Sequence, residues 1–168
     1  MVQPAGSSSL TVEPAQPDDF ARIAELTVDV YVRGGLASPT YESELADVTG
    51  RAGRSELLVV RDPTGSVVGS VALVLHGAFG NVIASDEEAA FRMLVVDPAA
   101  QGQGIGRLLV TSCLDRARAI GKRRMVISTD PRMTTAHRLY ERLEFTRLPE
   151  RDWCPEPGID LLVYSRDL

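Results

Sequence analysis

The segment Gln101 to Gly106, with the sequence Gln-Gly-Gln-Gly-Ile-Gly, constrains this chain most, because it stands where a strand gives way to a helix. The preceding apolar run, 89–96, stops at Asp97-Pro98, as strands do. From Ile105 an apolar stripe at helical spacing continues until Gly121. Three glycines let the backbone approach a ligand closely, and the first helical turn leaves N–H groups without partners. The segment therefore predicts an anion site suited to phosphate.

Two common nucleotide-binding motifs do not fit this spacing. The dinucleotide fingerprint needs G-x-G-x-x-G, whereas these glycines occupy the alternate positions 102, 104 and 106. The P-loop needs Gly-Lys-Ser/Thr, whereas Gly106 is followed by Arg107-Leu108. A glycine-rich helix start that holds no ligand stays open as the alternative. The residues alone thus indicate a phosphate-bearing ligand without naming it.

The hydrophobic periodicity predicts a mixed sheet with helices on its faces. Strands are expected at 10–13, 57–61, 66–76, 89–96, 124–129, 145–148 and 159–166. Helices are expected at 20–28, where Asp18 and Asp19 can cap the start, and at 41–48, 105–120 and 136–143. This order is typical of an α+β, three-layer α/β/α fold with about seven largely antiparallel strands and about four helices.

Length and composition limit the other possibilities. The 168 residues suit one domain, for which we expect 10–168, after a flexible lead-in at 1–9. A net charge of −5 does not favour nucleic-acid binding, and no apolar run is long enough to suggest membrane association, so a cytoplasmic location is expected. The two cysteines lack metal-ligand spacing, so no metal is expected. The apolar segment 161–164 could pair across a homodimer.

Two motifs at a fixed separation resemble one family. Gln101, Gly104 and Gly106, after Leu94-Val95-Val96-Asp97-Pro98, resemble the acyl-CoA loop Gln/Arg-x-x-Gly-x-Gly/Ala of the GNAT superfamily of N-acetyltransferases. Downstream, Ala136-His137-Arg138-Leu139-Tyr140 and then Phe145 resemble the family's second signature helix and the strand after it. The resemblance is close from about 89 to 145. It implies a sheet whose central pair of strands splays apart.

The resemblance also implies acetyl-CoA as co-substrate, lying in a cleft between the strands of Leu94 and Ile127. Backbone groups of Leu94, Val95 and Val96 would pair with pantetheine, and one N–H would polarise the thioester carbonyl. The amine would attack directly in a ternary complex. The residues that would hold the pyrophosphate through backbone N–H groups are Gln101, Gly102, Gln103, Gly104, Ile105 and Gly106.

Tyr140 matches the tyrosine often proposed in this family as the general acid that protonates the departing thiolate. A phenol is a proton donor at neutral pH. The residues alone favour a core tyrosine instead, because Tyr140 shares a helical stripe with Ala136, Leu139 and Leu143. With the resemblance, the general acid is the favoured role.

Two positions depart from the family pattern. Met133 stands where Asn is frequent, which either weakens cofactor affinity or moves the contact to Thr134 or Thr135. Thr134 and Ala136 are therefore expected among the cofactor contacts. Glu144 stands where Gly is usual, at a helix end where Gly favours the left-handed conformation.

The acceptor and the general base are not fixed by the sequence. The segments 31–41 and 151–158 are expected to set acceptor choice, with Tyr31, Tyr41 and Trp153 lining an amine pocket or packing in the core. The residues weighed as a base are Glu87, Glu88, Asp130, His76 and His137, and each fits a loop charge or a helix flank better.

The sequence predicts an acyl-CoA-dependent N-acetyltransferase that acetylates a primary amine of a small molecule or a peptide. A longer acyl donor is the alternative within the same chemistry. A non-catalytic acyl-CoA-binding regulatory module is the alternative from a different class, and retention of Tyr140 argues against it. A structural protein whose glycine turn is empty is the third reading.

Overall fold

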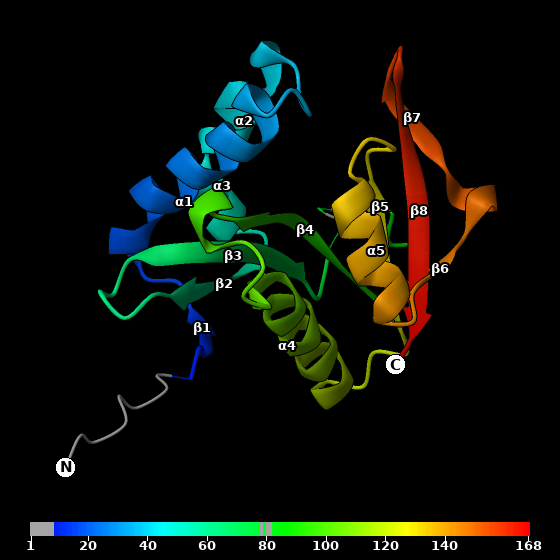
Figure 1. Ribbon diagram of the computed structural model, residues 1–168. Coiled ribbons are helices and arrows are strands. Elements are labelled where there is room, and N and C mark those ends of the chain that lie inside the picture. The colour runs from blue at the N-terminus through cyan, green and yellow to red at the C-terminus, as the bar shows by residue number, and fades with distance from the viewer. Residues whose placement is uncertain (1–8, 78, 80–81) are drawn as a thin grey trace.

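The computed structural model describes residues 9–77, 79 and 82–168, in which one eight-stranded sheet carries helices on both faces (Figure 1). The strand order is β1-β2-β3-β4-β5-β8-β6, and β7 pairs with β8. The strands are β1 (Val12–Pro14), β2 (Glu56–Arg61), β3 (Val67–Val74), β4 (Glu88–Val96), β5 (Arg124–Thr129), β6 (Thr146–Arg147), β7 (Trp153–Glu156) and β8 (Ile159–Asp167). The α-helices are α1 (Phe20–Val28), α2 (Glu42–Ala46), α3 (Val48–Ala52), α4 (Ile105–Ala119) and α5 (Thr134–Arg142). The expected three-layer α+β fold is confirmed.

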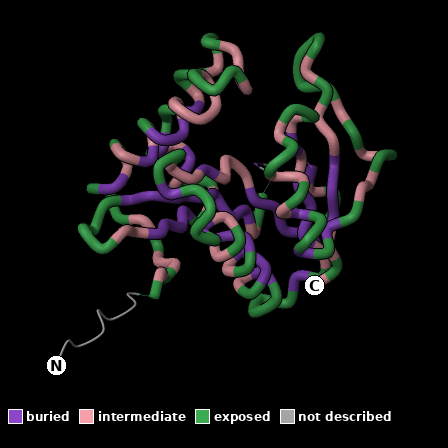
Figure 2. The backbone as a smooth tube through the Cα atoms, viewed as in Figure 1, coloured by how far each residue is buried: buried purple, intermediate pink, exposed green. Residues whose placement is uncertain are grey.

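Each face of the sheet is buried under a different group of helices. On one face, Ile23 and Leu26 of α1 pack with Val59 of β2 and Val95 of β4. On the other face, the stripe of α4 packs with Phe91 of β4 and with Tyr140 of α5. Every residue of β3 is buried, as expected for a strand covered on both sides (Figure 2). The two faces of β4 therefore lead to two different environments.

The parallel pair β4 and β5 is joined along only a short stretch. Their ladder pairs Glu88 with Arg124, Ala89 with Met125 and Ala90 with Val126, and it ends there. Beyond this point β5 stays paired with β8 as far as Thr129, whereas β4 stays paired with β3. The edges of β4 and β5 that face each other therefore separate, which confirms the expected splayed central pair. Figure 1 shows the two halves of the sheet diverging from this point.

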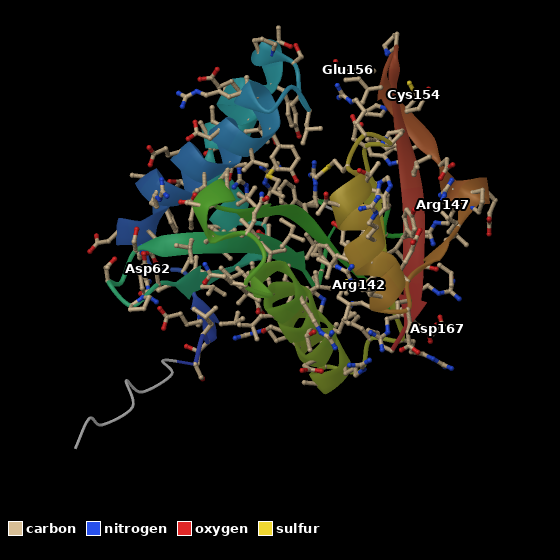
Figure 3. All side chains as sticks on the ribbon, in the orientation of Figure 1. Asp62, Arg142, Arg147, Cys154, Glu156 and Asp167 are labelled. Atoms are coloured by element: carbon tan, nitrogen blue, oxygen red, sulfur yellow. The ribbon has the colours of Figure 1, made fainter. Side chains whose placement is uncertain are left out.

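Several local expectations need correction. The predicted helix 41–48 is two short helices, α2 and α3, because Asp47 leaves helical geometry and its carboxylate caps the second one at Gly50 N–H. The segment expected to be a Pro-rich loop contains β7, and Figure 3 shows its residues Cys154 and Glu156 near the far end of the strand pair β7–β8. Both edges of β8 are occupied by strands of the same chain, so the expected pairing of 161–164 across a dimer is wrong in that form.

Other expectations lie outside what the structure tests. Residues 1–8 of the expected lead-in are outside the described residues, and the single domain at 10–168 stays a prediction. Within the described ranges, no helix is both long enough and apolar enough to cross a membrane. Nor do the described His, Cys, Asp and Glu residues gather in threes that could hold a metal ion.

Asp19 does not cap α1 as expected, because its carboxylate is committed elsewhere. It accepts hydrogen bonds from Arg61 Nη1 and Nη2, both at 2.8 Å, and from the Gln16 N–H at 2.7 Å. The hydrogen bonds from Arg61 lower the pKa of Asp19 most, and they outweigh the raising effect of burial. This pair joins the start of α1 to β2 and so fixes the helix that covers one face of β4.

We expect Asp19→Asn to lower the free energy of unfolding by about 2 kcal/mol at pH 7, because it leaves Arg61 without its strongest partner. The depressed pKa of Asp19 contributes stability above the unfolded pKa, near 3.8, and this is lost as pH falls through the lower folded pKa. Urea unfolding from pH 7 to pH 3 measures both effects. Asp18→Asn, at the exposed neighbour, is the control, and an equal loss in the two variants would contradict the assignment.

Candidate functional site

A β-bulge in β4 stands where the splay begins. Ser70 of β3 pairs with Val95 and Ala72 pairs with Arg92, so β4 uses one more residue than β3 between these pairs. Met93 within the bulge has a φ of 53°, in the left-handed region. A bulge leaves backbone groups outside the ladder and re-aims the strand, and bulges are frequent beside active sites. The backbone of Met93 and Leu94 is therefore available to a ligand in the gap.

The glycine loop and the start of α4 have the backbone geometry expected of an anion site. Gly104 is the N-cap with a φ of 78°, and Gly102 has a φ of 80°. The first hydrogen bond of α4 runs from the Leu108 N–H to the Gly104 carbonyl at 3.0 Å. The N–H groups of the three residues before Leu108 thus have no acceptor within the helix. A 15-residue helix adds partial positive charge at this end, so the loop fits the pyrophosphate of coenzyme A.

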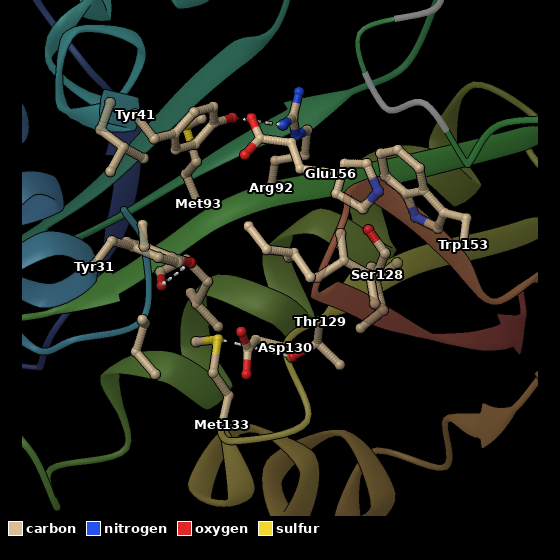
Figure 4. Close-up of a pocket in the computed structure, with 18 of the residues that line it drawn as sticks. Tyr31, Tyr41, Arg92, Met93, Ser128, Thr129, Asp130, Met133, Trp153 and Glu156 are labelled. Atoms are coloured by element: carbon tan, nitrogen blue, oxygen red, sulfur yellow. Dashed lines mark hydrogen bonds between the residues drawn. The ribbon is translucent and has the colours of Figure 1, made fainter. Parts of the chain in front are cut away.

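A cavity of about 440 Å³ occupies the gap between β4 and β5 (Figure 4). Its size suits a small ligand or the reactive end of a larger one. Five segments distant in sequence line it: the region from the end of α1 to α2, the bulge of β4, the end of β5 with the following loop, α5, and β7 with the start of β8. The lining residues include Tyr31, Tyr41, Arg92, Leu94, Asp130, Met133, Tyr140, Trp153 and Glu156.

Tyr140 lines this cavity and is also a core residue, so its place in the core is confirmed and its role as general acid stays a prediction. It is 5% exposed, and its ring lies 5.9 Å from that of Phe91 and 5.8 Å from that of Phe145. Its hydroxyl has no hydrogen-bond partner among the described residues. Burial raises the pKa of Tyr140 above its ordinary value, so the phenol keeps its proton. The hydroxyl therefore stays in its donating form, as the expected role requires.

Tyr31 also lies in the cavity wall, in agreement with the expectation that it lines a pocket. Its hydroxyl donates to the Leu94 carbonyl at 3.4 Å, and this hydrogen bond joins the segment directly after α1 to the bulge of β4. Burial raises the pKa of Tyr31 to about 12, so this phenol is protonated as well. Tyr41 and Trp153 join it in the lining, so all three expected aromatic residues meet at one cavity.

The other expected cofactor residues are spread along the path to α4. Leu94 lines the cavity, whereas the Val95 side chain is buried toward α1 and Val96 lies next to the glycine loop. Ile105 is 2% exposed, so only its backbone can serve a ligand. Thr134 is exposed at the first turn of α5 and Ala136 is half-buried, and neither lines the cavity. Their contact with the cofactor stays a prediction.

The carboxylates weighed as a general base are held by arginines. Asp130 lines the cavity, but Arg132 Nε and Nη2 donate to it at 2.9 and 2.8 Å and lower its pKa. Glu88 was expected to be a solvated loop charge, and it is instead buried in a bidentate pair with Arg151 at 2.8 and 3.0 Å. Burial would raise the pKa of Glu88, but hydrogen bonds from Arg151 and from the Ala84 N–H lower it overall. Neither carboxylate is poised to accept a proton.

The remaining candidate bases lie outside the cavity wall. His137 Nε2 lies 3.1 Å from the Asp130 carbonyl and 3.3 Å from the Thr129 hydroxyl, which fixes the imidazole at the end of β5. Glu87 is exposed, and His76 lines a separate hollow. The cavity instead presents a carboxylate that the sequence did not single out, Glu156 of β7.

The two departures from the family pattern take definite places. Met133 lines the cavity, and the Thr129 hydroxyl lies 3.8 Å from its sulfur, so an apolar side chain stands where an amide is frequent. Glu144 adopts a φ of 63°, the left-handed conformation for which Gly is preferred. The left-handed backbone conformation at the end of α5 is thus retained, although Glu144 replaces the usual Gly.

Sequence reasoning missed Arg92, Met93 and Glu156. Arg92 reads as one polar residue in an apolar strand, and nothing local indicates that the strand bulges beside it. Glu156 lies in a Pro-containing segment whose pairing depends on β8, which follows it in the chain. The alternation of β4 was the only available signal, since it placed Arg92 on the face opposite Phe91.

Comparisons with known proteins agree with this geometry. The model of the acetyltransferase (GNAT) family matches residues 20–145. Mycothiol acetyltransferase from Streptosporangium roseum is 48% identical over 52 residues, which are 31% of this chain and only 15% of that protein. A GCN5-related N-acetyltransferase from Kribbella flavida has a TM-score of 0.72 at 26% identity, covering 95% of this chain and 98% of its own.

A further solved structure, yncA from Salmonella typhimurium with its cofactor acetyl-CoA, has a TM-score of 0.69 at 24% identity and covers 96% of this chain and 95% of its own. The family match spans both the glycine loop and Tyr140. This chain belongs to the GNAT family of acetyltransferases.

Proposed function

We propose that this acetyltransferase moves the acetyl group of acetyl-CoA to a primary amine by direct attack in a ternary complex. The single observation that carries this proposal is the cavity between β4 and β5, which brings Tyr140 and the bulge of β4 to one space. Bound acetyl-CoA supplies the thioester carbonyl as the electrophile. The chain's own groups position it and handle charge and protons.

The backbone N–H groups from Gln101 to Gly106 would hold the pyrophosphate, and the free edge of β4 at Leu94, Val95 and Val96 would pair with pantetheine. An N–H of the bulge would donate to the thioester oxygen as negative charge develops there. The amine nitrogen forms the new N–C bond while the C–S bond breaks. Tyr140 then gives its proton to the thiolate sulfur, the proton that the amine nitrogen loses passes to water, and Tyr140 regains a proton from water.

Direct attack is favoured over an acetylated cysteine. Cys113 is completely buried in α4, and burial raises the pKa of its thiol, so no thiolate forms there. Cys154 is exposed and is not among the residues that line the cavity. Without a covalent step, catalysis rests on holding the amine and the thioester together.

We expect the protein to bind acetyl-CoA in calorimetry and to acetylate at least one member of a panel of small amines and peptides. Products are best detected by mass spectrometry, because the exposed Cys154 would react with thiol reagents. Binding without any acetylated product would favour the regulatory-module alternative. No binding at all would refute the proposal. A cytoplasmic location and a homodimer stay predictions.

A further inference from the structure

The acceptor end of the cavity is defined by Arg92 of β4. Arg92 pairs with Ala72 across the ladder, and Ala72 faces α1, whereas the neighbouring Phe91 packs on the α4 side with Tyr140. Arg92 therefore lies on the opposite face of the sheet from Phe91, which packs with Tyr140, and both faces meet the cavity at the gap between β4 and β5. The cofactor loop is on the Tyr140 side, so the Arg92 side is left for the acceptor.

The positive charge of Arg92 is not neutralised in the described structure. Its Nη1 donates to the Phe79 carbonyl at 2.7 Å and its Nη2 to the Tyr41 hydroxyl at 3.3 Å, both neutral groups. No described carboxylate lies within ion-pair distance of it. Glu156 lines the same cavity without reaching Arg92, and Asp130 is committed to Arg132. Figure 4 shows Arg92, Glu156 and Trp153 on the side of the cavity away from Asp130 and Met133.

Two further donors near this end lack partners. Arg51 is 2% exposed, donates to the carbonyl of the cavity residue Leu45, and has a buried Nε without an acceptor. Burial lowers the pKa of Arg51, and the nearby charge of Arg92 lowers it further, so the two guanidinium groups act on each other. The indole N–H of Trp153, in the cavity wall, is also buried without an acceptor. Buried donors without partners are costly unless a group that accepts hydrogen bonds, such as an oxyanion, binds there.

From these contacts we infer that the acceptor is a small amine bearing a carboxylate or phosphate group, whose oxyanion is bound by Arg92 beside Trp153. This inference rests on the proposed amine acetylation and narrows it to one substrate class. The planar guanidinium fork matches both oxyanions. Glu156, in the same wall, lies where the ammonium group of such a substrate would be attracted. The cavity volume of about 440 Å³ accommodates an amino acid or an aminoalkyl phosphate.

Matched pairs of amines test this inference. Phenylalanine is compared with phenylalaninamide for the carboxylate, and O-phosphoethanolamine with ethanolamine for the phosphate. We expect kcat/KM of the wild-type protein to favour the charged member of at least one pair by about 10-fold or more. Arg92→Gln should lower kcat/KM for the charged member to about that for the neutral member, which removes the preference, whereas Arg92→Lys should keep part of it. The pair that responds identifies the oxyanion.

Arg54→Gln is the matched control for charge and for packing. The Arg54 guanidinium lies 4.1 Å from the centre of the Phe79 ring and that of Arg92 lies 4.6 Å from it, but Arg54 does not line the cavity. We expect this variant to keep the preference. Circular dichroism checks that each variant is folded.

Binding is read out separately from turnover through Trp153, the only tryptophan of the chain. Titration with the charged amines should change its fluorescence in the wild-type protein and not in Arg92→Gln. Acetylation of the neutral amines without any charged preference would overturn this inference and leave the proposed function standing. If no amine is acetylated, the proposed function fails, and the fluorescence titration alone decides: an Arg92-dependent change supports the oxyanion site, and no change refutes it.

Discussion

Tyr140→Phe is expected to lower kcat by about 10²- to 10⁴-fold, the usual contribution of a positioned general acid. The substitution removes only a hydroxyl that has no partner among the described residues, and the ring keeps its contacts with Phe91 and Phe145. The free energy of unfolding and the Kd for acetyl-CoA should therefore stay close to their wild-type values. Steady-state kinetics, urea unfolding and calorimetry measure the three quantities.

Tyr164→Phe is the matched control, since its ring lies 6.2 Å from that of Tyr140 but does not line the cavity. It should leave kcat nearly unchanged. Because burial raises the pKa of Tyr140 above its ordinary value of 10.0, the protonated, donating form persists to higher pH than for a free phenol. The kcat of the wild-type protein should thus show no loss of this donor up to about pH 10. Equal turnover by the Tyr140→Phe variant and the wild type would exclude the role.

Gly104→Ala is expected to raise the Kd for acetyl-CoA by about 10- to 100-fold, because the cap orients N–H groups that bind a doubly charged group. A side chain at a φ of 78° costs about 1–2 kcal/mol, so the loop either distorts or destabilises the fold. No atom lies within 4 Å of the new Cβ, so the effect does not come from a clash. Calorimetry with coenzyme A measures the change.

Gly121→Ala separates ligand binding from backbone strain. Gly121 has a φ of 81° and equally open surroundings, but it follows the far end of α4. Both variants should lower the melting temperature to a similar extent, and only Gly104→Ala should weaken binding. A parallel loss of affinity in Gly121→Ala would show that the glycine loop acts through stability alone.

The parts of this fold that local chemistry determines could be predicted from the sequence. The expected strand at 124–129 coincides with β5, and α4 begins at Ile105, directly after Gly104. Both segments show a clear hydrophobic pattern and are bounded by residues that end a helix or a strand. The Asp-Pro stop after β4 could be predicted for the same reason. The role of Tyr140 as general acid was predicted only from the family resemblance, because the residues alone favoured a core tyrosine.

The parts that depend on pairing between distant segments could not be predicted. The bulge at Met93 arises from the register of β4 against β3, which no local pattern records. Glu88 reads as a surface charge until Arg151, far along the chain, is brought against it. β7 exists because β8 returns beside it, and a short segment containing Pro155 carries little strand signal alone. The absence of an ion-pair partner for Arg92 among the described residues could not be predicted either, because only the fold shows that it donates to the neutral groups of Phe79 and Tyr41.

Because the ladder between β4 and β5 is short, a co-substrate bound between these strands would also stabilise the fold. Within the described residues, this ladder has three paired positions, and beside it the Arg123 N–H donates to the Glu87 carbonyl at 2.8 Å. A pantetheine chain seated in the gap would supply the hydrogen bonds that a longer ladder would otherwise make. An acetyl-CoA concentration of 100 times the Kd adds about 2.7 kcal/mol to the free energy of unfolding. The added contacts would lie between β4 and β5. Amide hydrogens on the edges of β4 and β5 that face each other should then exchange slowly only while acetyl-CoA is bound. The concentration of acetyl-CoA would thus set the stability of the contact between the two halves of the sheet.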